Sequence, residues 1–304
     1  MHHLGIDIGG SAAKLALLDA DATPRWTRVQ ELPDHDDPTR NLRDRLDLIA
    51  SALLEVPGRV TVGIAAPGIV DAEHRRVVSL PGKLAGLEGV DWTAALAERL
   101  PPDVHAPRIH ALNDGHAAVL GEHGLGAGHG ADDVAMLTLG TGVGGGVVLN
   151  GRLCEGRNRR AGHLGHVSLD PYGRPSVFPT PGSLEWHVGA AYLHERTNGR
   201  YRTHRTLVAD VRAGAPAART EWRRTVRALA VGIASIVNVF DCERVILGGG
   251  LIAAGGLLFE PLAREMHQVE WRPCGLAVPV VPAELGRHAG SIGAALFGRE
   301  RSEP

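Results

Sequence analysis

Two glycine-rich turns interrupt apolar segments of the sequence in a way that suits phosphate binding. The first turn, Gly9-Gly10-Ser11, separates the apolar segments 4–8 and 15–18. Glycines at a turn let backbone N–H groups approach phosphate oxygens, and the Ser11 hydroxyl adds a donor. Asp7, just before the turn, is a suitable ligand for hydrated Mg²⁺. The same residues also fit an ordinary tight hairpin, since Gly-Gly turns are common in hairpins.

The second turn repeats this pattern with more glycine. An apolar segment, 134–139, leads into Gly140-Thr141-Gly142, continues through Gly144 to Gly146, and leaves through the apolar segment 147–150. Each glycine costs about 0.5–1 kcal/mol of backbone entropy relative to alanine. Five glycines in seven residues therefore need a compensating function, for which an anion cradle is the clearest candidate.

A polar pair, Asn113-Asp114, stands at the end of a strand that we expect at about 104–113, and it precedes small, helix-compatible residues at 115–122. In α/β sheets, ligands bind beyond the carboxyl ends of strands. Phosphoryl transfer needs an attacking hydroxyl that is oriented and deprotonated, which a carboxylate within hydrogen-bond reach can do. Asp114 is the candidate base. The pair also fits a helix N-cap, and the two roles are compatible.

The elements that would position these residues alternate between strands and helices. We expect two hairpins around the glycine turns, which implies a duplicated architecture whose halves face each other across a cleft. Apolar residues at helical spacing predict a helix at 41–54, followed by a buried strand at 60–66 that ends at Pro67-Gly68. Beyond a proline-rich stretch, 170–182, we expect helices at 183–196, 217–240 and 259–270, with a strand at 244–247 and Gly248-Gly249-Gly250 before the last of them.

Bulk properties restrict the partners. A length of 304 residues favours two domains. A formal net charge of -2 excludes the basic footprint of nucleic-acid binding and of attachment to an anionic membrane. Three scattered cysteines make no disulfide framework, and the sequence carries no signal peptide or membrane-spanning apolar run. We therefore expect a cytoplasmic protein with small-molecule partners, no nucleic acid and no membrane.

Six motifs, in order and at matching spacing, resemble those of the ROK family of sugar kinases and repressors. The resemblance runs from Leu4 to about Phe297. The motifs are Leu4-Gly5-Ile6-Asp7-Ile8-Gly9-Gly10-Ser11, Gly63-Ile64-Ala65-Ala66-Pro67-Gly68-Ile69-Val70, Leu112-Asn113-Asp114-Gly115-His116-Ala117-Ala118, Leu139-Gly140-Thr141-Gly142-Val143-Gly144-Gly145-Gly146, Gly162-His163-Leu164-Gly165-His166 and Leu247-Gly248-Gly249-Gly250-Leu251.

The resemblance implies an actin-like (ribonuclease H-like) α/β ATPase fold with two lobes. The amino-terminal lobe would hold residues 1–112 and about 290–304, and the carboxyl-terminal lobe residues 113–289. It implies ATP and Mg²⁺ as cofactors, a homodimer or tetramer, with the homodimer favoured, and phosphorylation of hexoses, commonly at the 6-hydroxyl. By position, Asp114 matches the catalytic base, Asn113 a sugar-hydroxyl contact, Gly68 a backbone sugar contact, and Gly248 to Gly250 the loop on the adenosine side.

Two departures from the family pattern concern the sugar site and a zinc site. The first acidic residue of the family's sugar-contacting Glu-x-Gly-His is replaced by His163, which leaves the sugar open. His166 matches that motif's histidine and either contacts the sugar or is an ordinary hydrogen-bonded histidine. Glu185 stands at the family's second sugar-contacting glutamate, or is a surface helix carboxylate. The family's zinc-binding cysteines are replaced by Ser176, Phe178 and Ser183, so we predict no structural zinc and a loop held by prolines and by packing of Phe178.

These features favour an ATP-dependent kinase acting on glucose or a close analogue. The exchange at His163 makes an amino-sugar such as kanosamine, or a cyclitol, an alternative, which would suit an antibiotic pathway. Lys14, three residues after Ser11, resembles the arrangement of polyphosphate glucokinases, so polyphosphate is an alternative donor. A non-catalytic sugar-sensing regulator is the other class. It is disfavoured because the chain begins at the first hairpin, without a DNA-binding helix-turn-helix, and keeps Asp7, Asp114 and both glycine turns.

Overall fold

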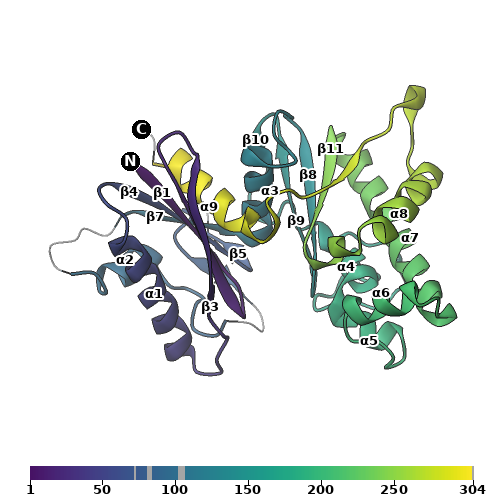
Figure 1. Cartoon of the computed structure of the whole chain (residues 1–304), viewed down its shortest axis with the longest axis horizontal. Coiled ribbons are helices and arrows are strands. Elements are labelled where there is room, and N and C mark those ends of the chain that lie inside the picture. The colour runs from purple at the N-terminus through teal and green to yellow at the C-terminus, as the bar shows by residue number, and fades with distance from the viewer. Residues whose placement is uncertain (72, 81–83, 102–106, 303–304) are drawn as a thin grey trace. The chain divides into compact units, whose positions relative to one another are not determined.

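A computed structural model describes residues 1–71, 73–80, 84–101 and 107–302, and its internal contacts divide the chain into two compact units (Figure 1). The first unit comprises Met1–His129, Leu153–Gly162 and Glu284–Pro304. The second comprises Gly130–Arg152 and His163–Ala283. The sequence suggested a boundary at residue 112, but in the structure the helix that begins at Asp114 lies in the first unit. That helix packs along the last helix of the chain, which explains its placement.

The first unit is built on a mixed five-stranded sheet in the order β3-β2-β1-β4-β7. Strands β1 and β2 form the antiparallel hairpin expected from the sequence, while β1, β4 and β7 run parallel. The carboxyl ends of these three parallel strands therefore meet at one edge, which brings Asp7, Gly68 and Asp114 toward the same place. The strands are β1 (His2–Ile8), β2 (Ala12–Leu18), β3 (Pro24–Glu31), β4 (Val60–Ala66) and β7 (Ile109–Asn113), with a small separate hairpin of β5 (Ile69–Val70) and β6 (Val77–Ser79).

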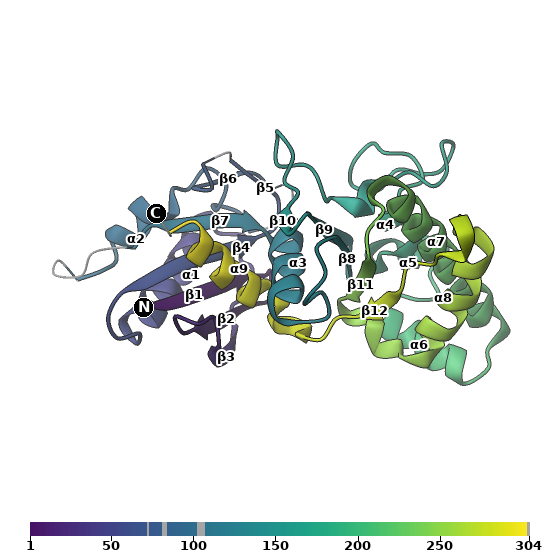
Figure 2. The same ribbon diagram turned by 90° about the horizontal axis from the view of Figure 1, so that it is seen from above.

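Helices cover both faces of this sheet (Figures 1 and 2). One face is covered by α1 (Pro38–Leu54) and α2 (Trp92–Ala97). On the other face, α9 (Ala289–Glu300) lies against β1 and β4, and α3 (Asp114–Leu125) packs along α9. Helix α1 starts sharply because the Asp37 carboxylate accepts hydrogen bonds from the N–H groups of Thr39 and Arg40, and Pro38 occupies the first turn.

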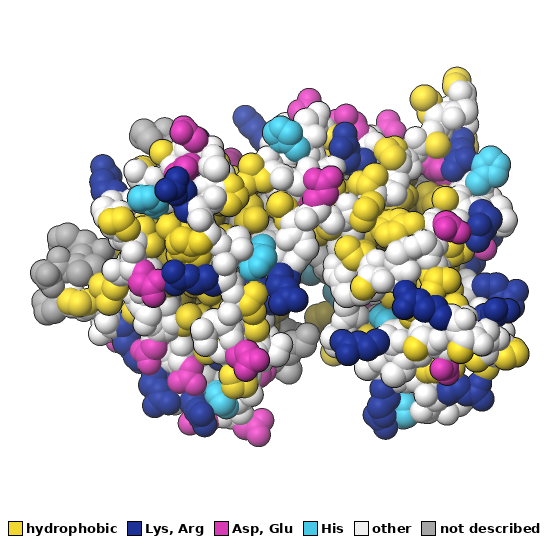
Figure 3. Space-filling view, viewed as in Figure 1, with side chains coloured by type: hydrophobic (Ala, Val, Ile, Leu, Met, Phe, Trp, Pro, Cys, Tyr) yellow, Lys and Arg dark blue, Asp and Glu magenta, His cyan; other side chains and the backbone are white. Residues whose placement is uncertain are grey.

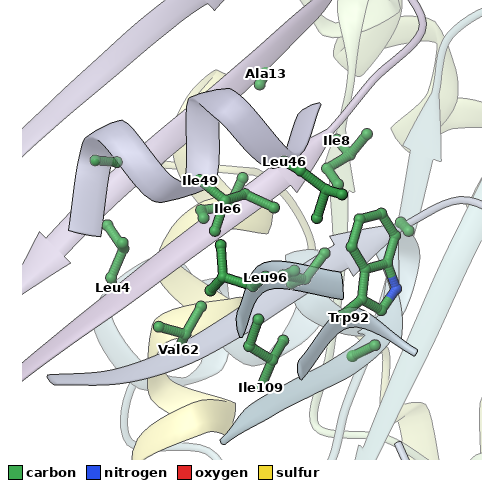
Figure 4. Packing of buried hydrophobic residues seen from close by; sticks show 14 of the residues in the cluster. Leu4, Ile6, Ile8, Ala13, Leu46, Ile49, Val62, Trp92, Leu96 and Ile109 are labelled. Carbon is green, nitrogen blue, oxygen red and sulfur yellow. The ribbon is translucent and has the colours of Figure 1, made fainter. Parts of the chain in front are cut away.

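Large apolar side chains fill the face beneath α1 and α2 (Figure 4). Alternate residues of β1 point to this face because side chains on a strand have a period of two. Each fully buried aliphatic or aromatic side chain contributes about 1.5–3 kcal/mol relative to exposure. This cluster is therefore the main source of stability in the first unit; it includes Leu4, Ile6 and Ile8 of β1, Leu46 and Ile49 of α1, and Trp92 and Leu96 of α2.

The opposite face is lined by small residues, and α9 approaches it closely. A Cβ added to Gly5 of β1 would lie 1.8 Å from the Ser291 carbonyl oxygen, and one added to Gly63 of β4 would lie 1.8 Å from the Ala294 carbonyl oxygen. Both distances are far below van der Waals contact, so only glycine permits this packing.

The second unit repeats the plan of a hairpin followed by parallel strands. Its sheet has the order β10-β9-β8-β11-β12, with β8 and β9 antiparallel and β8, β11 and β12 parallel. The strands are β8 (Val134–Leu139), β9 (Val143–Leu149), β10 (Arg152–Leu153), β11 (Arg244–Gly248) and β12 (Val280–Pro282). The helices are α4 (Leu184–Val188), α5 (Leu193–Arg196), α6 (His204–Arg212), α7 (Pro216–Phe240) and α8 (Gly256–Val269).

Three predicted segments differ from the structure. The strand expected at about 104–113 is β7, which begins only at Ile109, and residues 104–106 lie outside the described part of the chain. Gly144 to Gly146 belong to β9 and not to the turn, which is therefore limited to Gly140–Gly142. The helix predicted at 183–196 is divided into α4, a 3₁₀ turn at Ala190–Tyr192 and α5. The division occurs at Gly189, whose backbone is extended and whose N–H group still donates to the Glu185 carbonyl oxygen. Within the described residues no helix is both long and apolar enough to cross a bilayer.

Candidate active site

Asn113 and Asp114 have separate tasks in the structure. Asn113 is the N-cap of α3: its Oδ1 accepts hydrogen bonds from the N–H groups of Gly115, at 2.8 Å, and His116, at 3.3 Å. Its Nδ2 donates to the Gly68 carbonyl oxygen at 2.9 Å, so the side chain also ties the ends of β4 and β7 together. Asp114 is exposed, and its carboxylate accepts from the Gly115 N–H at 2.8 Å. Because Asn113 provides the cap, the Asp114 carboxylate is available to a substrate.

Asp7 lies across the first hairpin from Lys14, with 3.6 Å between its Oδ2 and the Lys14 Nζ. Burial raises the pKa of the Asp7 carboxyl to about 6, although the nearby Lys14 ammonium opposes the shift. The negative charge of Asp114 raises it further, so the two carboxylates interact electrostatically. Gly290 of α9 permits this close packing, because an added Cβ would lie 3.0 Å from the Asp7 carboxyl carbon. Two acidic groups with one partly compensating lysine form a site that a divalent cation would stabilise.

The raised pKa of Asp7 predicts a pH-dependent cost to folding. The folded state disfavours ionisation of Asp7. The stability of the chain is therefore highest below about pH 3.8, falls as the pH rises from there to about 6, and is constant above that with respect to this group. Asp7→Asn removes the ionisation. We expect its free energy of unfolding, relative to wild type, to increase by up to about 3 kcal/mol between pH 4 and pH 8 in urea denaturation without Mg²⁺. The exposed Asp36→Asn variant should show no such change, and a constant difference between Asp7→Asn and wild type would contradict the assignment.

The first glycine turn is open to a ligand. Gly10 and Ser11 are exposed, and nothing lies within 4 Å of an added Gly10 Cβ. The Gly9 N–H donates to the Ala12 carbonyl oxygen, which closes the turn, and the Lys14 Nζ lies 3.0 Å from an added Gly9 Cβ. The turn therefore combines exposed backbone with an ammonium group, which is a suitable arrangement for a phosphate.

Glu185 holds the second glycine turn in place. Its Oε2 accepts from the Val143 N–H at 3.0 Å, and an added Cβ on Gly142 would lie 2.4 Å from the same oxygen. Tyr192 donates its hydroxyl to Glu185 Oε1 at 3.5 Å, and burial together with the charge of Glu185 raises the pKa of the Tyr192 phenol. Glu185 is therefore not a free surface carboxylate, and both of its oxygens already have a partner within the chain. Tyr192 was not predicted as a site residue, because no sequence motif links it to Glu185.

A second glycine loop of this unit lies directly beside that turn. Gly249 has a φ of +85°, and an added Cβ would lie 2.4 Å from the carbonyl oxygen of Leu139, the residue before Gly140. Gly250 is exposed, with open space where a Cβ would be. Gly248, the last residue of β11, is buried, whereas Gly249 and Gly250 are exposed. Gly249–Gly250 and Gly140–Gly142 thus lie side by side, and one extended ligand could contact both.

The two histidines of the sugar motif lie in a row with Phe178. The rings of His163 and His166 are stacked with centroids 6.2 Å apart, and the Phe178 ring meets His166 edge-on at 4.7 Å. Phe178 is 40 % exposed, and the loop around it is also closed by hydrogen bonds such as Ser168 Oγ to the Pro181 carbonyl oxygen. Ser183 caps α4 through the Trp186 N–H. In the described parts of the chain, no three His, Cys, Asp or Glu side chains are grouped as a metal site would require.

The structure thus groups the predicted residues into two sets. Asp7, the first turn, Lys14, Gly68, Asn113 and Asp114 lie in the first unit, at the carboxyl edge of its sheet. The second turn, the loop at 248–250, His163, His166 and Glu185 lie in the second unit. Gly290 was not predicted, although its contact with Asp7 is part of the site.

The profile of the ROK family matches residues 3–301. The chain belongs to the ROK family. This ROK chain is 32% identical to the glucokinase of Thermotoga maritima, over 98% of this chain and 97% of the relative. It is 31% identical to the N-acetylmannosamine kinase of Escherichia coli strain SE11, over 98% of each. A crystal structure of a ROK family glucokinase from Streptomyces griseus with glucose and AMPPNP superimposes with a TM-score of 0.78 and 26% identity, over 99% of this chain and 100% of that one.

These comparisons confirm the family and the fold class inferred from the six motifs. The protein has the actin-like α/β ATPase fold of the ROK family, with two mixed sheets that each carry helices.

Proposed function

We propose that this ROK protein is an ATP-dependent sugar kinase and that Asp114 is its general base. The proposal rests on the different roles of two adjacent residues. Asn113 caps α3, and the Asp114 carboxylate stays exposed at the carboxyl end of β7. Similarity to glucokinases and an N-acetylmannosamine kinase over nearly the whole chain supports the reaction class.

In this proposal, Asp114 orients the attacking hydroxyl of the sugar and accepts its proton on a carboxylate oxygen. The hydrogen bond between Asn113 and Gly68 would fix the position of the base, and both residues would line the sugar site. When bound, Mg²⁺ would neutralise charge on the phosphates, and Asp7 would hold it through water. Gly9, Gly10, Ser11 and Lys14 in one unit and Gly140, Thr141 and Gly142 in the other would bind phosphate oxygens, while Gly248, Gly249 and Gly250 would contact the adenosine.

We propose a hexose or hexose analogue as acceptor, phosphorylated at the 6-hydroxyl. His163 would alter specificity, because an imidazole carries an N–H donor, whereas an ionised carboxylate only accepts hydrogen bonds. The stacked rings of His163 and His166 would present such groups side by side. This favours glucose or an amino-sugar such as kanosamine as the substrate.

A coupled assay of ADP formation tests the proposal. The purified chain with MgATP is offered glucose, mannose, N-acetylmannosamine, glucosamine, kanosamine and a cyclitol; we expect turnover with at least one hexose. Replacement of ATP by polyphosphate tests the donor. Sugar binding in calorimetry without turnover of any substrate, by either donor, would contradict the kinase proposal and favour a sugar sensor.

A further inference from the structure

A polar pocket lies in the first unit, at the amino-terminal end of β7. It has a volume of about 320 Å³ and is lined by Glu73, His74, Arg75, Arg108, His110 and Arg301. These residues come from the connection between β5 and β6, from the start of β7 and from the segment just after α9. None of them belongs to the predicted kinase site.

The lining is strongly basic, with three arginines and one glutamate. Arg75 is already paired, with Glu73 at 3.6 Å and with Asp91. Arg301 lies 3.3 Å from Glu155 and stacks over the Phe297 ring. For Arg108, which is exposed, the described part of the chain provides no ion pair. One guanidinium in the pocket is therefore available to a ligand.

A buried histidine adds an independent observation. His110 is only 5% exposed and is one of the residues that line this pocket, and its Nε2 has no hydrogen-bond partner among the described residues. Burying an unsatisfied polar group costs about 1–3 kcal/mol. Burial lowers the pKa of His110 to about 4, and Arg108 and Arg301 lower it further, so the imidazole is neutral at pH 7. A neutral imidazole that is protonated on Nε2 donates one hydrogen bond, which a ligand oxygen would accept.

His74 gives the pocket a fixed wall. Its Nδ1 lies 3.0 Å from the Ala111 carbonyl oxygen, and its Nε2 lies 3.3 Å from Glu155 Oε1. Burial lowers the pKa of His74 to about 4, with further contributions from Arg301 and Arg159. Glu155 also binds Arg159 at 2.6 Å. The hydrogen bond from Nδ1 to the Ala111 carbonyl oxygen fixes the His74 ring, and its Nε2 faces the Glu155 carboxylate without a hydrogen bond. Arg108 and His110 are therefore the groups left to meet a ligand.

We propose that this pocket binds a phosphate-type dianion, either inorganic phosphate or the phosphate group of a monoester. The Arg108 guanidinium and the His110 Nε2 would donate to its oxygens, and Arg301 would add charge. Arginine suits this ligand because its planar fork donates to phosphate in two directions. Figure 3 shows basic side chains distributed over both units and mixed with acidic ones. The distribution of surface charge therefore does not identify the anion site. The pocket and the unpartnered Nε2 of the buried His110 identify it.

This site is distinct from the kinase site and does not depend on it. His110 precedes Asn113 by three residues on β7, which corresponds to about 10 Å along an extended strand. An occupant at His110 would therefore be separate from a ligand of the glycine turns. The strand that carries the cap residue of α3 would nevertheless be in direct contact with the anion pocket.

Calorimetric titration of the full chain, with ionic strength held constant by chloride, tests the proposal. Inorganic phosphate and glycerol 3-phosphate serve as separate probes, so that the free ion and the monoester are distinguished. We expect at least one to bind, and Arg108→Gln to weaken that binding at least about tenfold, because a hydrogen bond to a charged group is lost. Arg108→Lys should restore part of it. Arg59→Gln, an exposed arginine of the same unit, should bind like wild type.

The imidazole C–H signals in proton NMR locate the binding. The signal of His110, assigned with a His110→Gln variant, should shift with the anion in wild type and not in Arg108→Gln. Binding of equal strength in wild type and Arg108→Gln, or no binding of either probe at about 10 mM, would overturn the proposal. Because no readout requires turnover, failure of this site is distinguishable from failure of the kinase function.

Discussion

Replacement of Asp114 by asparagine is expected to lower kcat/KM for sugar phosphorylation by about 10²–10⁴-fold. Asparagine keeps the size and an acceptor oxygen for the Gly115 N–H, but it cannot accept the proton of the substrate hydroxyl. The cap of α3 is provided by Asn113 and remains intact. The free energy of unfolding should therefore stay within about 0.5 kcal/mol of wild type. Steady-state kinetics and urea denaturation of the same preparation measure both quantities.

A variant of Asn113 separates an effect on stability from an effect on catalysis. Asn113→Ala removes the cap and the hydrogen bond to the Gly68 carbonyl oxygen, so it should cost at least about 1 kcal/mol of stability. Asp36→Asn, an exposed carboxylate of the same unit, should change neither activity nor stability. If Asp114→Asn lost stability and kept its rate, Asp114 would be a structural residue and the proposed base would be wrong.

The sequence predicted the parts of the fold that depend on local pattern. Both hairpins were predicted because glycine turns between apolar segments are a short-range signal, and the pairing of β1 with β2 and of β8 with β9 confirms them. Helix α7 was predicted almost to the residue, 217–240 against Pro216–Phe240. The family and the actin-like fold followed from the order of six motifs.

What the sequence did not predict depends on contacts between distant segments. The residues of Asn113-Asp114 alone allow either side chain to cap the helix; only the end point of β7 decides that Asn113 does so. The contact of Glu185 with the Val143 N–H joins residues 42 positions apart. The anion pocket combines three separate segments, and no motif marks any of them. Helix α9 was not predicted either, since six of its twelve residues are glycine or alanine and its apolar periodicity is weak.

Helix α9 is the basis of the second large effect, which is on stability. Gly293→Ala is expected to lower the free energy of unfolding by more than about 3 kcal/mol. An added Cβ would lie 1.7 Å from the Ala117 carbonyl oxygen of α3 and 2.7 Å from the Gly121 backbone nitrogen. Both atoms are backbone and cannot move away as a flexible side chain can. Since domains are stable by only about 5–15 kcal/mol, much of the protein would be lost on expression.

Gly10→Ala is the matched control, because nothing lies within 4 Å of the added methyl group and the backbone φ is not positive. Its unfolding midpoint in urea should equal that of wild type. An equal midpoint for Gly293→Ala would mean that α3 and α9 are farther apart than the structure places them. The Gly293→Ala substitution would also affect the candidate active site, because Gly290 of the same helix packs on Asp7 and α3 begins with Asp114. Because one helix contacts both elements that carry the carboxylates, separating α3 from α9 should displace Asp114 from Asp7, and the folded remainder of Gly293→Ala should therefore lose activity as well as stability.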